Sequence, residues 1–568
     1  MLRISNFYPM RRACNIYLIS LVGILFTCSS VGVAAVKSKK QNAAPNQNRT
    51  LSSINFQNQP QTKDIEFLNQ GLGTIPKQLE SEYNQKVFQS LEENSKQKIH
   101  RGVALISIAM YCAKSKFCIN AIPGLFTQAL AEWPNFPESA EAPKIWKSLR
   151  TFLPDQSEKN ESILTALAET LFSNSILNNS DDLFVYLTAK KMHERGQYAD
   201  ALKLAQKIAP NQALYRRAKY LEGLCYLQLN SLEKAREAFR LVVQSDEFKD
   251  ESASSELSSR MARLRESAVL NLARLSYEAG EFLESIGYYR SIESDSPYFF
   301  DSLNEQIWAF FLAGLPNRAL GAQYAVASPF YKNRFNPEAY FLRSILFYWL
   351  CDYDRSINEV KGFIQHARLE GDQLMASLNS WNSQPEKQTL LNYAKIYDET
   401  AKRISARNIG LGPKTLTELL RRDSNKKVYD ILVETQQLRL QLPVTFAGLK
   451  GTVFIETLAK AYENFELTQQ LALGRRVKSV LVSLGSDYKK ALEQTQMLYL
   501  EVLTAKKDTL LGKSRAGEPD QFKGTEVPFD DFKANQAMSW KQNKAEYWFD
   551  ELGHYVFQYP TKCESNGK

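Results

Sequence analysis

The chain has 568 residues, of which 44% are apolar and 23% are charged, and its formal net charge at neutral pH is +9. This apolar content is enough for a packed core and excludes a chain that is disordered as a whole. The basic excess is small and forms no dense Lys/Arg stripe, so nucleic acid is not an expected partner.

The first 35 residues have the form of a secretory signal peptide. Arg3, Arg11 and Arg12 form a basic start, an apolar run follows over residues 16–26, and small side chains end at Ala35. Cleavage after Ala35 would remove three arginines and no acids, which lowers the net charge from +9 to +6. No later stretch is apolar enough to span a bilayer. We therefore expect a periplasmic or secreted chain without a transmembrane span after cleavage.

Two other interpretations of this segment remain open. One is a retained membrane anchor, although the unbroken apolar run is shorter than the roughly 20 residues that a span needs. The other is a lipoprotein acylated at Cys28, which the preceding Phe26 and Thr27 fit poorly.

Five cysteines follow the predicted cleavage site, and no two of them form a C-x-x-C pair. This spacing gives no support to a zinc site or a redox motif. Cys112 and Cys118 could form a disulfide if a turn lies between them, because exported compartments permit disulfides. Cys225 and Cys351 lie in helical patterns and are expected to be buried thiols.

The rest of the chain divides into a linker and a series of helical regions. Residues 36–64 are rich in Gln, Asn, Ser and Pro and predict a disordered linker. Good helix formers dominate from residue 65 onward, which predicts an all-α protein. We expect a helical N-terminal region over 65–181, a repeat region over 182–366 and a long-helix region over 367–512. A loop and an aromatic C-terminal segment make up 513–568.

Five similar helix breaks recur within residues 182–366. Each is followed by a short second helix that begins with aromatic-x-x-small or a close variant of it. The breaks begin at Gly196, Asn230, Gly280, Gly314 and Cys351, at spacings of 34, 50, 34 and 37 residues. The long interval contains a Ser-, Asp- and Glu-rich stretch over about 245–260, which is expected to be a surface loop.

The 34-residue period resembles that of the tetratricopeptide repeat, a helix–turn–helix unit. The second repeat is most similar to the family, with Gly223 and Tyr226 in its first helix and Ala235 and Phe239 in its second. The fourth and fifth repeats depart from the pattern. The resemblance implies an α-solenoid of about five stacked repeats, in which small residues allow close approach of the helices.

The resemblance further implies a concave groove lined by the first helix of each repeat. Aromatic, Arg, Asn and Lys side chains in such a groove suit an extended peptide or a partner helix. The alternative is that they pack against the flanking helices of the chain itself. The implied groove residues are Tyr186, Lys190, Arg217, Tyr220, Asn271, Arg274, Tyr277, Asn304, Trp308, Phe311, Phe341 and Tyr348.

The C-terminal third contains two further apolar patterns. Tyr488, Tyr499 and Leu510 lie on one helical face, which fits either a long helical hairpin or coiled coil or a plain packed helix. Residues 546–555 are too apolar for a free tail, so we expect this segment to dock on the rest of the chain, with a partner-binding motif as the alternative.

Motifs for catalysis, metals and cofactors are scarce. The four histidines are far apart, no nucleophile elbow occurs, and the stretch from Gly410 to Lys414 has Pro413 where a phosphate-binding loop needs glycine. We therefore assign no catalytic, cofactor-binding or metal-binding residue. A cell-wall lytic enzyme that uses a glutamate of residues 367–512 remains an alternative, as does an outer-membrane lipoprotein assembly factor.

The layout as a whole resembles exported tetratricopeptide proteins of the gliding-motility and envelope machineries of predatory and gliding bacteria. The shared features are the signal peptide, the central repeats and the terminal stretch from Trp548 to Tyr555 followed by Cys563. This resemblance implies a scaffold or adaptor that binds other proteins in a cell-envelope complex.

Overall fold

The computed structural model describes much of the chain from residue 98 to residue 563. The described residues are 98–116, 118–139, 142–154, 158–171, 181–244, 255–402, 410–445, 453–511, 540–541, 547–556, 559 and 561–563. The predicted signal peptide with Cys28, the linker 36–64 and the loop 513–535 lie outside them.

The described part is all-α apart from one short strand pairing. It contains 19 α-helices and a parallel pair of two-residue strands, β1 (Trp540–Lys541) and β2 (Tyr555–Val556), with Trp540 opposite Tyr555. The chain separates into two compact units. One, the N-terminal unit, comprises described residues of 98–191 and 431–468. The other, the array unit, comprises described residues of 192–430 and 469–563.

The N-terminal unit contains four complete helices, residues 182–191 of a fifth helix, and a hairpin formed by parts of two longer helices. The four are α4 (Lys98–Ser115), α5 (Ile122–Glu132), α6 (Ala142–Phe152) and α7 (Glu158–Thr170). The hairpin joins the end of α22 (Asp423–Thr445) to the start of α23 (Val453–Leu510), where Arg439 pairs with Glu466 at 2.6 Å. A Cβ on Gly124 would lie 2.1 Å from the carbonyl oxygen of Ala461, so α5 contacts the backbone of α23 directly.

A disulfide closes the turn at the end of α4. Cys112 and Cys118, the pair that the sequence singled out, are bonded, with their Cα atoms 4.7 Å apart. Lys116, between them, has a φ of 58°, so the chain reverses through a left-handed residue instead of continuing the helix. The turn brings together two side chains that would diverge on one helix.

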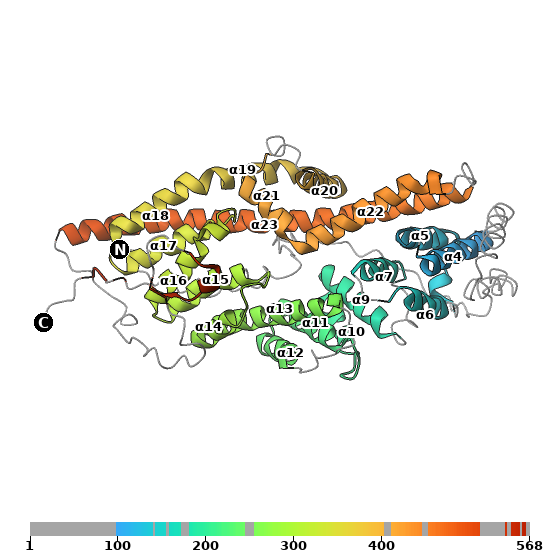
Figure 1. Ribbon diagram of the computed structural model, residues 1–568, viewed down its shortest axis with the longest axis horizontal. Coiled ribbons are helices and arrows are strands. Elements are labelled where there is room, and N and C mark those ends of the chain that lie inside the picture. Colours follow the sequence, from blue (N-terminus) through green and yellow to red (C-terminus); the bar gives the residue numbers. More distant parts are fainter. Residues whose placement is uncertain are drawn as a thin grey trace, which may run out of the picture. The chain divides into compact units, whose positions relative to one another are not determined.

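The repeat region consists of consecutive helix pairs (Figure 1). Each second helix also packs on the first helix of the next pair, which is suggestive of a helical repeat array. The first predicted pair is α9 (Asp182–Glu194) and α10 (Tyr198–Ala205), which a tight turn joins. In the other four the two helices pack on each other: α11 (Tyr215–Gln228) with α12 (Leu232–Gln244), α13 (Ser255–Ala279) with α14 (Phe282–Arg290), α15 (Phe299–Leu312) with α16 (Pro316–Val326), and α17 (Glu338–Trp349) with α18 (Tyr353–His366).

The five predicted breaks share one turn geometry. Gly196, Asn230, Gly280, Gly314 and Cys351 each have a φ between 56° and 81°, the left-handed region in which a helix commonly ends. In every case the amide of this residue donates to the carbonyl three residues earlier, and the next amide donates to the carbonyl five residues earlier. The repetition that was predicted from residue types is thus present in the backbone.

Small residues allow the two helices of a pair to approach closely, as predicted. A Cβ on Gly223 of α11 would lie 2.6 Å from the ring of Phe239 on α12. In the fifth pair the hydroxyls of Ser344 and Ser356 hydrogen-bond to each other at 2.9 Å and fill the same position. Such short separations bring more side-chain atoms into van der Waals contact along each pair.

The prediction of a surface loop over about residues 245–260 was partly wrong. Helix α13 begins at Ser255, so the end of the supposed surface loop is helical, and residues 245–254 lie outside the described part. At the third break Phe282 contacts Tyr277 of its own pair, with ring centroids 5.6 Å apart. The rings of Tyr348 and Tyr353, which are also five residues apart, make the same kind of contact at the fifth break. Both contacts form because the tight turn folds the second helix back on the first.

The array continues into a group of helices that pack on α23. These are α19 (Arg368–Trp381), α20 (Glu386–Ala401) and α21 (Pro413–Arg421). Tyr488 of α23 stacks on Phe363 of α18, and a Cβ on Gly371 of α19 would lie 2.2 Å from its ring. Gly474 approaches the backbone of Leu390 in the same way. Within this unit α23 therefore runs antiparallel to α18 and α19 as a packed helix (Figure 1).

Candidate functional site

The aromatic C-terminal segment packs on the array, as the first of the two interpretations expected. Leu552 and Tyr555 are 2% and 4% exposed and belong to the core built by α13 to α17. Tyr547 stacks on Tyr324 of α16, with ring centroids 4.3 Å apart. A Cβ on Gly321 of α16 would lie 1.7 Å from the carbonyl oxygen of Tyr555, so the backbone of β2 rests on the helix itself.

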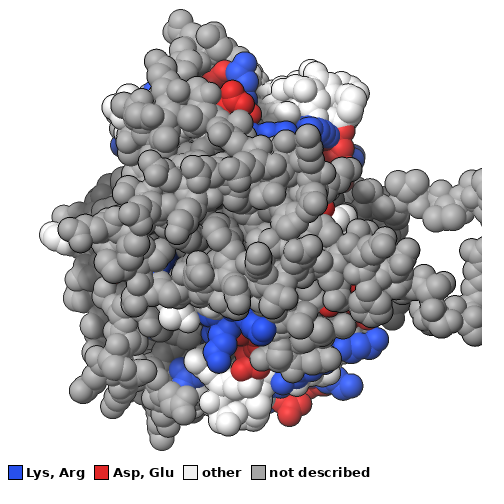
Figure 2. Space-filling model, turned by 90° about the vertical axis from the view of Figure 1, so that its right-hand side faces the viewer, with Lys and Arg blue, Asp and Glu red and all other residues white. Residues whose placement is uncertain are grey.

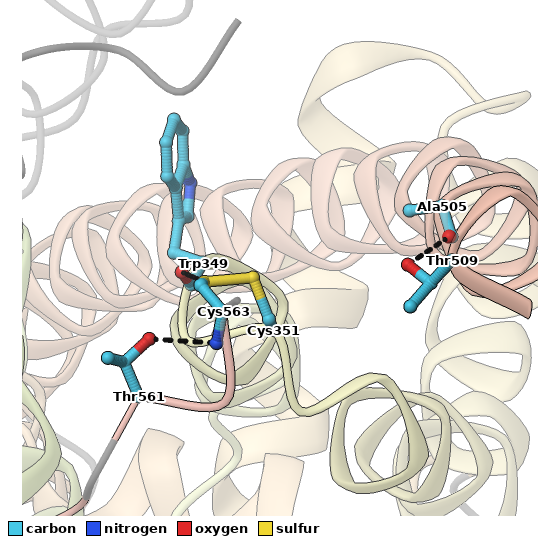
Figure 3. The surroundings of a disulfide bond; sticks show 6 residues. All are labelled: Trp349, Cys351, Ala505, Thr509, Thr561 and Cys563. Atoms are coloured by element: carbon cyan, nitrogen blue, oxygen red, sulfur yellow. Dashed lines mark hydrogen bonds between the residues drawn. A yellow bond between two sulfur atoms is a disulfide. The ribbon is translucent and has the colours of Figure 1, made fainter. Parts of the chain in front are cut away.

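A disulfide fixes the end of this segment to the turn of the fifth pair. Cys351 is bonded to Cys563, and the Cα atoms lie 4.9 Å apart (Figure 3). The expectation that Cys351 is a buried free thiol is wrong, because the residue sits at the left-handed turn after α17 and not within the helix. The same expectation for Cys225, which lies inside α11, is confirmed.

Asp352, next to this disulfide, holds the segment by polar contacts. Its carboxylate accepts hydrogen bonds from the hydroxyl of Tyr559 and, at 2.8 Å, from the ammonium of Lys562. The amide of Lys562 also donates to the carbonyl of Leu350 at 2.9 Å. Burial would raise the pKa of Asp352, but the bonds from Lys562 and Tyr559 outweigh it and hold the pKa below its ordinary value. This carboxylate is therefore charged where it meets the tail.

The docked segment also creates an exposed aromatic patch, which we define as Phe330, Trp548 and Phe549. Phe330 lies after α16 in the 3-10 turn Pro329–Tyr331, and its ring meets that of Phe549 with centroids 5.5 Å apart. The exposed fractions are 52% for Phe330, 60% for Trp548 and 44% for Phe549. Large aromatic side chains left this accessible are typical of protein-binding surfaces.

The twelve predicted groove residues are divided between the two units. Tyr186 and Lys190 of α9 belong to the N-terminal unit, where Tyr186 is buried and Lys190 pairs with Glu161 of α7 at 3.0 Å. The other ten belong to the array unit. The first of these, Arg217 of α11, is buried.

The polar groove residues of α11 and α13 form hydrogen bonds between these two helices or from α13 to α15. The hydroxyls of Tyr220 and Ser267 lie 2.5 Å apart, and the amide nitrogen of Asn271 lies 3.5 Å from the Tyr220 hydroxyl. Burial raises the pKa of Tyr220, so its hydroxyl stays neutral. Arg274 forms a two-point ion pair with Glu305 of α15, in which the Nε–Oε2 distance is 2.8 Å.

The polar groove residues of α15 form similar hydrogen bonds to α17 and to the residues just before it. The side-chain amide of Asn336 donates to Asn304 at 2.8 Å. The indole nitrogen of Trp308 donates to the carboxylate of Glu338 on α17 at 2.9 Å. Successive first helices are thus joined by at least one polar contact from α11 to α17.

The aromatic groove residues lie within or against the core of the array. Phe341 and Tyr348 are 1% and 5% exposed, Phe311 is buried beside them, and Trp308 packs on Phe341 with centroids 6.0 Å apart. Tyr277 is half-buried against the same core. The buried members of this set offer no surface to a partner.

Helix α23 contacts this face of the array. Leu498 and Val502 of α23 are buried in the core that the first helices form. Asp487 lies close enough to Glu338 for their charges to repel. Burial, and after it this repulsion, raises the pKa of Asp487 to about 7. The chain's own helix thus contacts the face at which the resemblance implied a bound peptide.

Two buried glutamates of the region proposed for a lytic site have structural partners. Glu370 of α19 accepts from the amide of Thr415 at 2.6 Å and from its hydroxyl at 3.1 Å, which caps the start of α21. Glu418 pairs with Arg334 at 2.5 Å. An enzymatic role for another glutamate of residues 367–512 stays a prediction.

Figure 2 shows one face of the molecule, on which the described Lys and Arg side chains lie beside Asp and Glu side chains. Within the described residues no group of three or more His, Cys, Asp and Glu side chains is arranged to hold a metal ion. The helices among those residues also include none that is long and apolar enough for a membrane span.

Three features were not predicted from the sequence: the pairing of Cys351 with Cys563, the role of Asp352 and the contribution of Phe330 to the patch. A signal for the first existed, since Cys351 occupies the turn position that glycine or asparagine holds in the other pairs. Phe330 carried no comparable signal, because its neighbour Phe549 is distant in sequence.

No protein-family model matches the sequence, and no curated protein is significantly similar to it.

Proposed function

We propose that this chain is an exported scaffold that binds other proteins in a bacterial cell-envelope complex, such as a motility machinery, through surfaces of a tetratricopeptide-type solenoid. The five recurring turns and the consecutive packing of the helix pairs support the repeat assignment. Two disulfides support an oxidising compartment, since cytosolic proteins rarely keep them.

The observation that carries the proposal is the exposed aromatic patch. It is made from two distant segments, and the disulfide and the Asp352 contacts hold one of these segments against the array. A rigid patch of large aromatic side chains loses little conformational entropy when a partner covers it, which favours binding. We therefore place partner binding at this patch and not at the buried face of the first helices.

The test uses a photo-activatable phenylalanine analogue in place of Phe549, introduced in the cells that export the chain. We expect ultraviolet light to give discrete cross-linked products that contain another envelope protein. The same analogue at Lys395, an exposed position on α20, serves as the control and is expected to give none. Equal products at both positions, or none at Phe549, would contradict the assignment.

A variant series extends this test. Trp548→Ala should weaken capture of the cross-linked partner at least tenfold, because a central aromatic contact contributes about 2 kcal/mol or more. Leu229→Ala removes another exposed apolar side chain, 41% accessible, and should leave capture unchanged.

Release of muropeptides from purified peptidoglycan, lost on one Glu→Gln change within residues 367–512, would instead establish the lytic enzyme.

A further inference from the structure

The outward face of the last turns of α23 is apolar and exposed. Met497 and Leu500 are 65% and 66% exposed, Leu503 is 40% exposed, and Leu510 is 78% exposed. The opposite side of the same turns carries Leu498, which is buried. At 100° per residue Met497, Leu500 and Leu503 fall within about 120° of the helix circumference on the side away from Leu498, and Leu510 lies about 20° beyond Leu503. We call this sector, with the exposed Glu493 and Lys507, the outer face of α23.

Charges are placed symmetrically along this outer face. Glu493 and Lys507 are both exposed and lie seven residues before and after Leu500. At about 1.5 Å per residue each charge lies roughly 10 Å from Leu500 along the helix axis. In the described part of the chain neither side chain has an ion-pair partner, whereas the neighbouring Lys506 pairs with Asp354 of α18.

This symmetric placement of opposite charges favours a second copy of the same helix as the binding partner of the outer face. A second α23, placed antiparallel about a two-fold axis through Leu500, would bring Glu493 of each copy beside Lys507 of the other. Met497 would face Leu503, and Leu500 would face itself. A parallel copy would instead place Glu493 on Glu493 and Lys507 on Lys507, which repel.

We propose that two copies of this chain associate through the outer face of α23 in an antiparallel, two-fold-symmetric pair. The apolar side chains of the face leave water on pairing, and the two Glu493–Lys507 contacts set the direction of the helices. This association uses a surface separate from the aromatic patch, so it can fail without affecting the capture of envelope partners, and the reverse also holds.

The direct test is sedimentation of the purified mature chain over a range of concentrations, with two charge reversals and their combination. Glu493→Lys and Lys507→Glu each place like charges opposite each other at both contacts, so each should weaken dimerisation by about tenfold. The double variant E493K/K507E restores opposite charges and should return to within about threefold of the parent. Far-UV circular dichroism should be unchanged in all four proteins, because these side chains are exposed.

A cysteine trap locates the axis. Leu500→Cys should form a disulfide-linked dimer on mild oxidation, because the residue faces its own copy, whereas Lys395→Cys should remain monomeric. Sedimentation as a monomer at every concentration would overturn the proposal. So would a double reversal that dimerises no better than the single ones. If the Leu500→Cys chain stays monomeric and its new thiol does not react with maleimide, another part of the chain, such as residues 512–539, covers this face. That outcome would also contradict the proposed dimer.

Discussion

Replacing Arg274 with methionine should loosen the array at the contact between its third and fourth helix pairs. Arg274 and Glu305 are 3% and 8% exposed, and the guanidinium makes two hydrogen bonds to the carboxylate. The hydroxyl of Tyr289 supplies the remaining bond to Glu305, at 3.1 Å. Without Arg274 the carboxylate keeps only that neutral donor in a buried site. One-sided removal of a buried ion pair costs about 3–5 kcal/mol.

The assay is hydrogen exchange followed by mass spectrometry on peptides from α13 and α15, because a chain with two compact units need not unfold in one step. A loss of about 3 kcal/mol corresponds to exchange that is faster by more than a hundredfold. Arg368→Met is the matched control. Its exposed pair with Asp372 at 3.6 Å should contribute less than about 1 kcal/mol.

The effect should depend on pH in a defined direction. Burial raises the pKa of Glu305 above its ordinary value, although Arg274 opposes this. The carboxyl group of Glu305 therefore binds a proton more tightly in the folded protein than in the unfolded chain. The stability that this tighter proton binding contributes is lost as the pH rises through the pKa of the folded state. Removing Arg274 raises that pKa further, so the Arg274→Met defect should be smaller at pH 5 than at pH 8.

Two outcomes would refute this reasoning. One is an Arg274→Met variant that exchanges no faster than Arg368→Met. The other is a double variant, R274M/E305L, that is as unstable as the two single changes added together. An apolar pair leaves no buried charge, so we expect the double variant to recover most of the loss.

The remaining predictions concern the tail and α23. Cys563→Ser opens a loop that the disulfide closes across 212 residues, and should lower the free energy of unfolding by up to about 5 kcal/mol on a chain-entropy estimate. Proteolysis of the C-terminal segment should accelerate, and dithiothreitol should not accelerate it further, because the bond to Cys351 is already absent. Asp487→Asn should raise the melting temperature at pH 8 and leave it unchanged at pH 4, because a carboxyl with a pKa of about 7 destabilises the fold only where it is ionised; an equal rise at both pH values would count against this. Gly321→Ala should displace strand β2 and expose the tail to protease, whereas Gly287→Ala, whose Cβ would meet nothing within 4 Å, should stabilise α14 by up to about 1 kcal/mol; a protected tail in the first variant would contradict the contact.

The sequence by itself determined the features that depend on neighbouring residues. The five helix breaks were predictable because a helix end needs a residue that tolerates a left-handed conformation, and glycine or asparagine supplies this four times out of five. The close contact of Gly223 with Phe239 was predictable for a related reason, since only a small residue leaves room between paired helices.

Only the tertiary structure decided what covers each face of the array. Trp308 and Phe341 have the chemistry of a peptide-binding groove, and the same chemistry suits a core that α23 helps to close. Amphipathic helices bury their apolar sides against whichever partner the fold brings near, and that choice depends on contacts between distant residues. The pairing of Cys351 with Cys563 required the same knowledge, because 212 residues separate the two cysteines and only the folded chain places their Cα atoms within bonding reach.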